Sequence, residues 1–456
     1  MAAEEYDLIV IGAGSGNSLL GDEMADWRVA IVEQDRFGGT CLNRGCIPSK
    51  MFVHAADVAA TVRDAGRFGV QAQFGGADWP AIRDRVFGRI DPLHQQAVDY
   101  RCGQGTDVLL GAARFVGAHE VEVDGKRLTA PRIVIAAGSR PRVPEIEGLG
   151  PVDGVDFHTS DTIMRLDALP PRMLIVGGGF IAAEMGHVFG SLGTEITIVN
   201  RGTTLLANED HDVQRLFTRL YEQRYDVRQN SHVRSVRREA RGLLVEVETA
   251  GARSVVEVDV LLLAAGRVPN TDRLGMAEAG IALDAHGHAL VDDSYLTNVP
   301  GVWALGDAAN HFQLKHMANA ESRIIRHNLL HVDQPLPIRF PLVPSAVFAD
   351  PQVASVGAKE HELRAAGIPY LVSTREYSNT AYGWALEDTT SFVKLLAAPG
   401  SRLLLGAHII GPEASIMIQP LIQAMALGST VDQLAHDVIY IHPALTEVVE
   451  QALLDL

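Results

Sequence analysis

The sequence is poor in cysteine, and it lacks both a long apolar run and an excess of basic residues. Three cysteines in 456 residues are too few for a disulfide framework, which excludes the small secreted domains that several bridges hold together. No stretch approaches the roughly 20 apolar residues that a membrane-spanning helix needs. The formal net charge of -17 disfavours binding to nucleic acid or to an anionic membrane surface.

The beginning and the composition of the chain suggest an ordinary cytosolic globular protein. Residues 1–7 are acidic and lead directly into an apolar segment, without the basic start and longer apolar stretch of a signal peptide. Hydrophobic residues make up 47% and charged residues 21%, as in globular proteins. At roughly 150 residues per domain, the length predicts about three domains.

A glycine-rich turn follows the first apolar run and predicts a nucleotide site. Residues 6–11 and 29–32 have the pattern of buried strands, and the segment between them is expected to contain a helix. Such a turn lets backbone N–H groups approach a pyrophosphate, and Glu33 at the end of the second strand can accept hydrogen bonds from ribose. Asn17 occupies the third position of the usual motif, where glycine is common. The glycines of the turn are Gly12, Gly14 and Gly16.

The same order of elements returns about 165 residues later, which predicts a second nucleotide-binding domain. Residues 173–176 and 195–199 are the expected strands. The turn between them contains Gly177, Gly179 and the small residue Ala182. After its second strand there is no acid but Asn200-Arg201, and an arginine here suits the 2′-phosphate of NADP better than the ribose of NAD.

Two further segments repeat each other, and the end of the chain has a different pattern. The strand at residues 133–136 runs into a turn at Gly138, and the strand at 261–264 runs into a turn at Gly266. This repetition suggests two domains of related design. A helical stretch reaches about residue 330, and the proline-containing segment 334–344 is the expected linker. The last ~115 residues lack a glycine turn and form the expected third domain.

Cys41 and Cys46 form the most informative pair in the chain. In a regular helix their separation would be about 7.5 Å, beyond the roughly 7 Å that a disulfide can bridge, so a bridge requires a distorted turn. Gly45 and Pro48 make that distortion possible, and a strained bridge is easier to reduce. A helix N-terminus and Lys50 would both favour the thiolate. The pair therefore predicts redox chemistry.

Metal binding and a structural role for the third cysteine fit the sequence less well. A metal site needs about four ligands, and neither a second cysteine pair nor a histidine lies near Cys41 and Cys46. Cys102 stands alone, and we expect it to be a small, partly buried hydrophobic residue.

His442 and Glu447 are the candidate acid–base pair. Pro443 between them can open a helix, which would place the carboxylate one and a half turns on. Thiol chemistry needs a proton carrier with a pKa near neutrality, and a carboxylate on its other nitrogen fixes the tautomer of a histidine.

Together these motifs resemble the flavoprotein disulfide reductases, the pyridine nucleotide-disulfide oxidoreductase family of glutathione reductase and dihydrolipoyl dehydrogenase. The resemblance covers essentially the whole chain. The carrying segments are Gly12 to Gly16, Gly39-Thr40-Cys41, Cys46-Ile47-Pro48, Gly179 to Glu184, Ala304-Leu305-Gly306-Asp307, and His442-Pro443 with Glu447.

The resemblance implies an α/β fold with two Rossmann-like dinucleotide-binding domains and a C-terminal α+β dimerisation domain. It implies an FAD-binding domain in residues 1–160 and 273–340, an NADPH-binding domain in 161–272, and an interface domain in 341–456. Obligate homodimers are expected, with His442 serving the active site of the other subunit.

The resemblance also implies a role for each site residue. Cys46 would be the charge-transfer thiol against the flavin and Cys41 the thiol that attacks the substrate. Lys50 would pair with Glu184 beside the flavin. His442, held by Glu447, would protonate the leaving thiolate. FAD would be bound by the first glycine turn together with Glu33, Gly39, Thr40, Gly138 and Asp307, and NADPH by Gly177, Gly179, Arg201 and Gly266.

Further segments point to one member of the family, a reductase of a low-molecular-weight disulfide. These segments are Gly14 to Ser18, Phe87 to Pro92, Ala381 to Ala385, and Gln419 to Met425. Where glutathione reductase has a second phosphate-binding arginine this chain has Ala207, so NADH stays open beside NADPH. The alternatives are a dihydrolipoyl dehydrogenase using NAD, against which the missing acid at Asn200 argues, and a flavin-bearing scaffold protein without activity.

Overall fold

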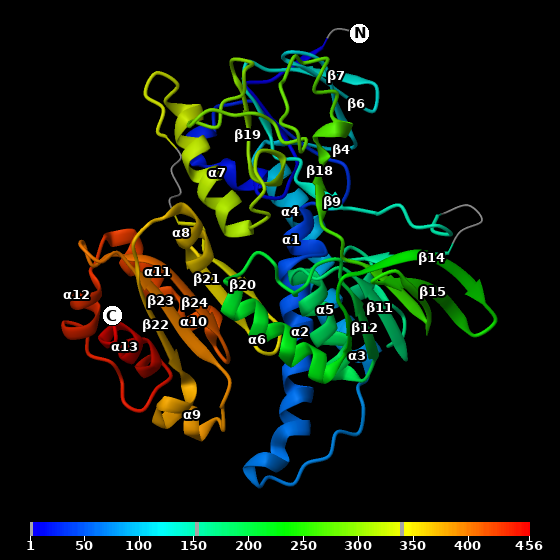
Figure 1. Cartoon of the computed structure of the whole chain (residues 1–456). Coiled ribbons are helices and arrows are strands. Elements are labelled where there is room, and N and C mark those ends of the chain that lie inside the picture. The colour runs from blue at the N-terminus through cyan, green and yellow to red at the C-terminus, as the bar shows by residue number, and fades with distance from the viewer. Residues whose placement is uncertain (1–2, 151–154, 338–341) are drawn as a thin grey trace.

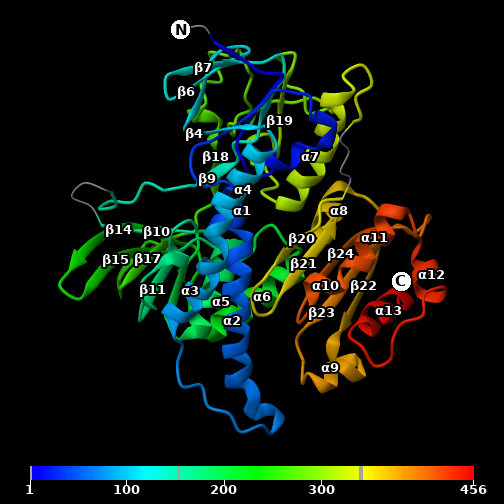
Figure 2. The same ribbon diagram turned by 180° about the vertical axis from the view of Figure 1, so that it is seen from behind.

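The computed structural model describes residues 3–150, 155–337 and 342–456, which form three packed parts (Figures 1 and 2). Two parts are built on parallel sheets and the third on an antiparallel sheet. The predicted α/β class with two dinucleotide-binding domains and a C-terminal domain is confirmed.

The first part contains a five-stranded parallel sheet with the order β19-β8-β2-β3-β4. Its strands are β2 (Leu8–Ile11), β3 (Val29–Glu33), β4 (Asp107–Leu110), β8 (Ile133–Ile135) and β19 (Val302–Ala304). β2 and β3 are buried throughout, as expected for strands covered on both faces. A second small sheet consists of β1 (Glu4–Glu5), β5 (Ala113–Gly117), β6 (Glu120–Val123) and β7 (Lys126–Thr129). The helices are α1 (Gly39–Asn43), α2 (Cys46–Asp64), α3 (Trp79–Ile90), α4 (Pro92–Gly103) and α7 (Lys315–Leu330).

The prediction of a helix after the first glycine turn is wrong. Two short 3₁₀ turns, Gly16–Leu19 and Asp22–Met24, stand in its place. Arg101 of α4 explains the difference, because its guanidinium donates hydrogen bonds to the side-chain oxygen of Asn17 at 2.6 Å and to the Asn17 carbonyl oxygen at 2.7 Å. The Asn17 carbonyl oxygen thus accepts a hydrogen bond from a side chain instead of from the backbone N–H four residues on. Gly21 nearby lowers the helix propensity further.

The second part has a parallel sheet with the order β10-β17-β11-β12-β13. Its strands are β10 (His158–Thr159), β11 (Arg172–Val176), β12 (Glu195–Val199), β13 (Asp226–Arg228) and β17 (Val260–Leu263), covered by α5 (Phe180–Leu192) and α6 (His211–Arg224). An antiparallel sheet of β14 (Ser231–Glu239), β15 (Gly242–Thr249) and β16 (Ala252–Val258) projects from it. Because β10 already belongs to this sheet, the second domain includes residues before the boundary predicted at 160.

The two repeated segments pair with each other. β9 (Ser139–Pro141) and β18 (Arg267–Pro269) form a two-stranded antiparallel ladder in which Ser139 lies opposite Pro269. The chain passes from the first part to the second after β9 and returns after β18. The ladder therefore lies where the two chain connections between the nucleotide-binding parts run side by side.

The C-terminal part is an antiparallel sheet with the order β20-β21-β24-β23-β22. Its elements are β20 (Ser345–Val347), β21 (Val353–Gly357), α8 (Glu360–Ala366), β22 (Leu371–Glu376), α9 (Ala381–Ala385), β23 (Phe392–Ala397), β24 (Leu404–Ile410), α10 (Ala414–Met417), α11 (Gln419–Leu427), α12 (Val431–His436) and α13 (Thr446–Leu454). α13 begins at Thr446, so Pro443 does not open it as predicted. The predicted boundary at 340 and the middle of the predicted linker 334–344 lie outside the described residues.

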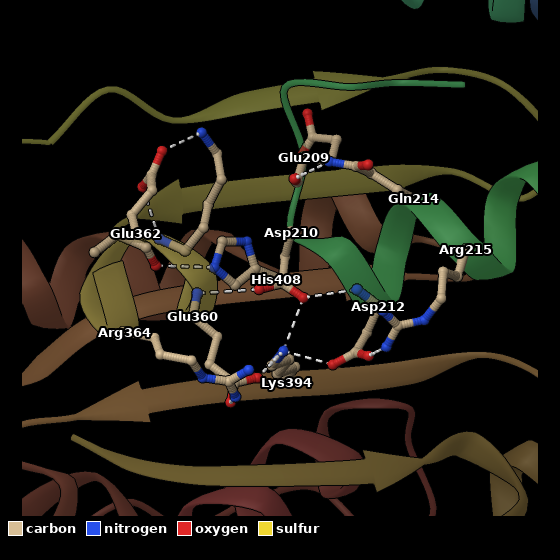
Figure 3. Close-up of polar contacts among 12 residues, drawn as sticks. Glu209, Asp210, Asp212, Gln214, Arg215, Glu360, Glu362, Arg364, Lys394 and His408 are labelled. Atoms are coloured by element: carbon tan, nitrogen blue, oxygen red, sulfur yellow. Dashed lines mark hydrogen bonds and ion pairs between the residues drawn. The ribbon is translucent and has the colours of Figure 1, made fainter. Parts of the chain in front are cut away.

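A buried lysine connects the second part to the C-terminal part (Figure 3). Lys394 of β23 has a side chain that is 2% exposed, and its Nζ lies 2.8 Å from Asp210, 2.5 Å from Asp212 and 2.6 Å from Glu360. Asp210 and Asp212 belong to the start of α6, whereas Glu360 begins α8. Three carboxylates from two domains thus converge on one ammonium group.

Candidate active site

One cavity of about 690 Å³ brings most of the predicted flavin-site residues together. It extends from the end of β3, past the first glycine turn, to the segment that contains the two cysteines, and its size suits a small-molecule ligand. The predicted residues that line it are Gly12, Gly14, Glu33, Gly39, Thr40, Cys41, Cys46, Lys50, Gly138, Glu184 and Asp307. The predicted residues that do not line it, within the described chain, are Gly16, Gly177, Gly179, Arg201, Gly266, His442 and Glu447.

A break between α1 and α2 brings Cys41 and Cys46 into contact. Cys41 belongs to α1, whereas Cys46 is the first residue of α2, and Arg44 and Gly45 between them leave the helical conformation. The predicted distortion of the turn is therefore present. A Cβ on Gly45 would lie only 2.9 Å from the carbonyl oxygen of Thr40, so the close turn needs glycine. Both cysteines are thiols here, and the two side chains are close enough to shift each other's pKa in opposite directions.

The two sulfur atoms differ in acidity. The hydrogen bond from Cys41, together with the charge of Lys50, lowers the pKa of the Cys46 thiol to about 6. The pKa of the Cys41 thiol is raised, because it holds its proton in the bond to Cys46 and is partly buried. Cys46 at the start of a helix is thus the sulfur that ionises first.

Lys50 and Glu184 form an ion pair beside Cys46. Lys50 Nζ lies 2.7 Å from both carboxylate oxygens of Glu184, whose side chain is 5% exposed. The backbone N–H of Phe348 donates a further hydrogen bond of 3.1 Å to Glu184. The carboxylate holds the ammonium group at the cavity wall, one helical turn after Cys46.

The other end of the cavity has the features of a dinucleotide site. Gly12 has φ +105°, and a Cβ there would lie 2.3 Å from the carbonyl oxygen of Ala136, so the turn closes tightly on β8. Glu33 accepts hydrogen bonds from the N–H groups of Ala13 and Asp35 at 2.9 and 3.0 Å, and burial raises its pKa. A carboxylate beside a glycine turn, with a thiol pair at the far end of the same cavity, fits an extended dinucleotide such as FAD.

Asp307 lines the same cavity as the first glycine turn. It directly follows the turn after β19, and Ser139 donates a hydrogen bond of 2.5 Å to its carboxylate. Gly138 next to Ser139 has φ +65°, a conformation that favours glycine. The repeated segment after β8 therefore positions the aspartate.

The second glycine turn repeats the geometry of the first. Gly177 has φ +133°, and a Cβ there would lie 2.2 Å from the carbonyl oxygen of Ala264, the counterpart of Ala136. Gly179 directly precedes α5. The Asn200 side chain folds back onto its own loop, donating to the carbonyls of Gly202 and Thr204. Arg201 beside it is exposed.

Comparison with known proteins decides the family. The sequence profile of the pyridine nucleotide-disulphide oxidoreductases matches residues 6–322, and the profile of their dimerisation domain matches residues 343–453. The chain belongs to this family. It is an FAD-dependent NAD(P)H:disulfide oxidoreductase, as the motifs predicted.

Two relatives and one solved structure define the resemblance further. The chain is 45% identical to the mycothione reductase of Mycobacterium tuberculosis over 99% of its own length and 100% of the relative. It is 32% identical to the glutathione reductase of Burkholderia cepacia, with 98% of each chain covered. The HOCl-induced flavoprotein disulfide reductase RclA from Escherichia coli has 28% identity and a TM-score of 0.85, covering 98% of this chain and 99% of that one. The predicted resemblance, which the segments singled out above assign to mycothione reductase, is confirmed.

His442 and Glu447 form a pair away from this cavity. His442 Nδ1 lies 2.7 Å from Glu447 Oε1, which is the predicted contact. The His442 side chain is 73% exposed, and its neighbours Ile439 and Ile441 are 96% and 75% exposed. Large exposed apolar side chains that lie close together are typical of a surface that another chain covers. The match to a dimerisation domain agrees with a homodimer.

The sequence analysis missed Ser139 and Lys315, which both contact the wall of the cavity. Ser139 could have been found from its place directly after Gly138. Lys315 lies eight residues after Asp307 at the start of α7, where no pattern distinguishes it from a solvated lysine.

In the described ranges, no helix is long and apolar enough to cross a bilayer.

Proposed function

We propose that the protein reduces mycothione, a low-molecular-weight disulfide, to two molecules of mycothiol with NADPH. The observation that carries the chemistry is the Cys41–Cys46 pair, held in contact by the break before α2 in the cavity that also contains Lys50 and the glycine turn. The choice of mycothione is supported by 45% identity along the whole length of a mycothione reductase. Arg201 and the absence of an acid at Asn200 support NADPH over NADH.

FAD would lie along the cavity from Glu33 to Cys46, and NADPH would bind at the second glycine turn. When bound, the two cofactors would supply a pair of electrons to the Cys41–Cys46 bridge. Taking up these electrons and two protons opens the bridge. The low pKa of Cys46, about 6, means that this sulfur holds negative charge at neutral pH.

Cys41 would carry out exchange with the substrate. Its thiolate attacks one sulfur of the disulfide, the S–S bond breaks, and a mixed disulfide with Cys41 forms while the first thiolate leaves. His442 of the partner subunit would protonate that thiolate, with Glu447 holding its other nitrogen. Cys46 then attacks the Cys41 sulfur, the bridge re-forms, and the second thiolate leaves. In total, one disulfide takes up two electrons and two protons and becomes two thiols.

A side-by-side assay tests the substrate and the nucleotide. The purified holoenzyme is given mycothione, glutathione disulfide or lipoamide, each with NADPH and with NADH, and nucleotide oxidation is followed by absorbance. The proposal expects the highest kcat/KM with mycothione and NADPH. A higher value with glutathione disulfide or lipoamide would refute the substrate assignment, and a higher value with NADH would refute the role of Arg201.

A further inference from the structure

Lys315 lies in the active-site cavity at a position that no part of the proposed mechanism uses. It is the first residue of α7, and it lines the cavity together with Cys41 and Cys46. Its Nζ donates a hydrogen bond of 2.9 Å to the hydroxyl of Ser15 in the glycine turn. The ammonium group is thereby fixed on the wall that the first domain contributes.

Three features make this placement unfavourable for a lysine without a function. A cation at a helix N-terminus opposes the helix dipole. The side chain is also partly buried, and this burial lowers the pKa of Lys315. Across residues 3–150, 155–337 and 342–456, no carboxylate lies within 4 Å of Lys315 Nζ, whereas Lys50 is neutralised by Glu184. An unneutralised cation in a cavity favours anions there, and this cavity would hold two kinds, the diphosphate of FAD at the glycine turn and the thiolates of the cysteine pair.

The cysteine pair needs such a cation on the side of Cys41. Once Cys46 is ionised, forming a thiolate at Cys41 places two negative charges side by side, and the pKa of Cys41 is raised accordingly. Lys315 acts in the opposite direction and lowers the pKa of Cys41, as Lys50 does for Cys46. Lys315 interacts with the charge of both sulfur atoms, whereas Lys50 acts on Cys46, so Lys315 is the cation that acts on Cys41.

We propose that Lys315 is a positioning residue that stabilises negative charge on Cys41 during thiol–disulfide exchange. This inference rests on the proposed function, because it assigns Cys41 as the attacking sulfur. Lys315 acts by its charge and takes no proton from the thiol, so His442 of the partner subunit remains the proton carrier. The other ionisable groups that line this cavity are Cys46, Lys50, Glu184, Glu33, Asp35, Arg36, Arg44, Arg140, Asp161, Arg267, Arg273 and Asp307.

The alternative is that Lys315 only fastens α7 to the glycine turn through Ser15. The variants S15A and K315M separate the two roles, because S15A removes the hydrogen bond and keeps the charge, whereas K315M removes both. K315R keeps a charge at the same place. K126M, at an exposed lysine of β7, is the matched control for loss of a positive charge.

The test measures alkylation of Cys41 as a function of pH. FAD-loaded dimers are reduced with dithiothreitol, so the result does not depend on NADPH or on the identity of the substrate, and are then treated with iodoacetamide. Trypsin cleaves after Arg36, Arg44 and Lys50, so the two cysteines fall in separate peptides that mass spectrometry can quantify.

We expect K315M to raise the pH midpoint of Cys41 alkylation by about one unit, which lowers the rate at pH 7 roughly tenfold. K315R, S15A and K126M should stay within about twofold of the wild type. An unchanged midpoint in FAD-loaded K315M, or an equal shift in S15A, would overturn the proposal.

A second measurement needs no change at Lys315. Electrostatic coupling is reciprocal, so removing the Cys41 thiolate must make Lys315 easier to deprotonate. In dithiothreitol-reduced C41S, labelling of Lys315 by an amine reagent at pH 9 should be severalfold faster than in the wild type, while labelling of Lys126 is unchanged. Equal labelling of Lys315 in both proteins would exclude the coupling even if K315M fails to bind FAD.

Discussion

Lys50 Nζ lies 2.7 Å from each carboxylate oxygen of Glu184, and this contact joins α2, which carries Cys46, to α5 of the second domain. Phe348 from the start of the C-terminal part donates to the same carboxylate. The ion pair therefore sits where all three parts of the chain meet. Any change in the charge of this ion pair should therefore change the pKa of Cys46, which lies one helical turn before Lys50.

Replacing Glu184 with Gln should make Cys46 more acidic. The carboxylate raises the pKa of Cys46, whereas Lys50 lowers it, so E184Q leaves the effect of Lys50 unopposed. The pH midpoint of the long-wavelength thiolate–flavin absorbance should fall by roughly one unit, and K50M should raise it. Anaerobic titration of the reduced enzyme measures this midpoint, with E195Q at an exposed glutamate as control. Identical midpoints in E184Q and K50M would contradict the prediction.

The wild-type absorbance itself should depend on pH in a defined direction. The pKa of Cys46 is about 6, below the ordinary cysteine value of roughly 8.5. The thiolate is therefore the main species at pH 7 and is lost as the pH falls through about 6. The band of the anaerobically reduced enzyme should be full at pH 8, half present near pH 6, absent in C46S and retained in C41S. Persistence of the band in C46S would reverse the assignment of the two sulfurs.

Replacing His442 with Ala should slow disulfide reduction by about 10²- to 10⁴-fold, because the leaving thiolate loses its proton donor. E447Q should have a smaller effect of the same kind, because it loosens the 2.7 Å contact to His442 Nδ1 without removing the histidine. Turnover is measured with the disulfide and, separately, with ferricyanide, which bypasses the thiols. H436A, at an exposed histidine of α12, is the matched control. Equal losses with both acceptors would show that His442 acts elsewhere.

Much of the fold could be predicted because its strands are continuous apolar runs. The strand expected at residues 195–199 matches β12, and the one at 29–32 differs from β3 by a single residue. The helix after the first glycine turn could not be predicted correctly, because Arg101 prevents it from a position 84 residues further along the chain. A contact of that kind depends on tertiary packing, which local propensity does not contain.

The site was predictable to the extent that its residues lie in short motifs. The break between Cys41 and Cys46 follows from the length of a disulfide and from Gly45, and the structure contains it. The roles of the site residues stay predictions, as do the remaining domain boundaries. Lys315 was beyond prediction, because its hydrogen-bond partner Ser15 is 300 residues away in sequence.

Alanine at the two equivalent glycines should separate the cofactors. A Cβ on Gly12 would meet the Ala136 carbonyl at 2.3 Å, and one on Gly177 would meet the Ala264 carbonyl at 2.2 Å. Both positions have positive φ, so each alanine should cost roughly 1–3 kcal/mol and distort its turn. G12A should lose FAD, measured by flavin absorbance per chain. G177A should keep FAD and bind NADPH more weakly, measured by calorimetry.

Gly75 provides the control for these two variants. No atom lies within 4 Å of a Cβ placed there, and its φ is not positive. G75A should therefore retain both cofactors. Loss of FAD in G177A would show that the two turns are not independent.

Replacing Lys394 with Met should destabilise the protein strongly. Lys394 is almost fully buried, and within the described residues it is the only ion-pair partner of Asp210, because Arg215 and Arg364 pair with Asp212 and Glu360 instead (Figure 3). Breaking a buried pair of this kind costs about 3–5 kcal/mol, whereas the exposed pair of Lys359 with Glu362 contributes about 0–1 kcal/mol. Urea unfolding of K394M and K359M compares the two. A K394M midpoint equal to that of K359M would mean that the buried cluster adds nothing.

The ladder between β9 and β18 is one of the contacts that set the relative position of the two nucleotide-binding parts. Its three residue pairs act together with the packing of α2 against α5 and with the ion pair of Lys50 and Glu184. A slip of one pair would translate one part against the other by about 3.3 Å and turn every side chain in the ladder to the opposite face. We therefore expect insertions in this ladder to slow electron transfer between the two cofactors while each part still binds its own.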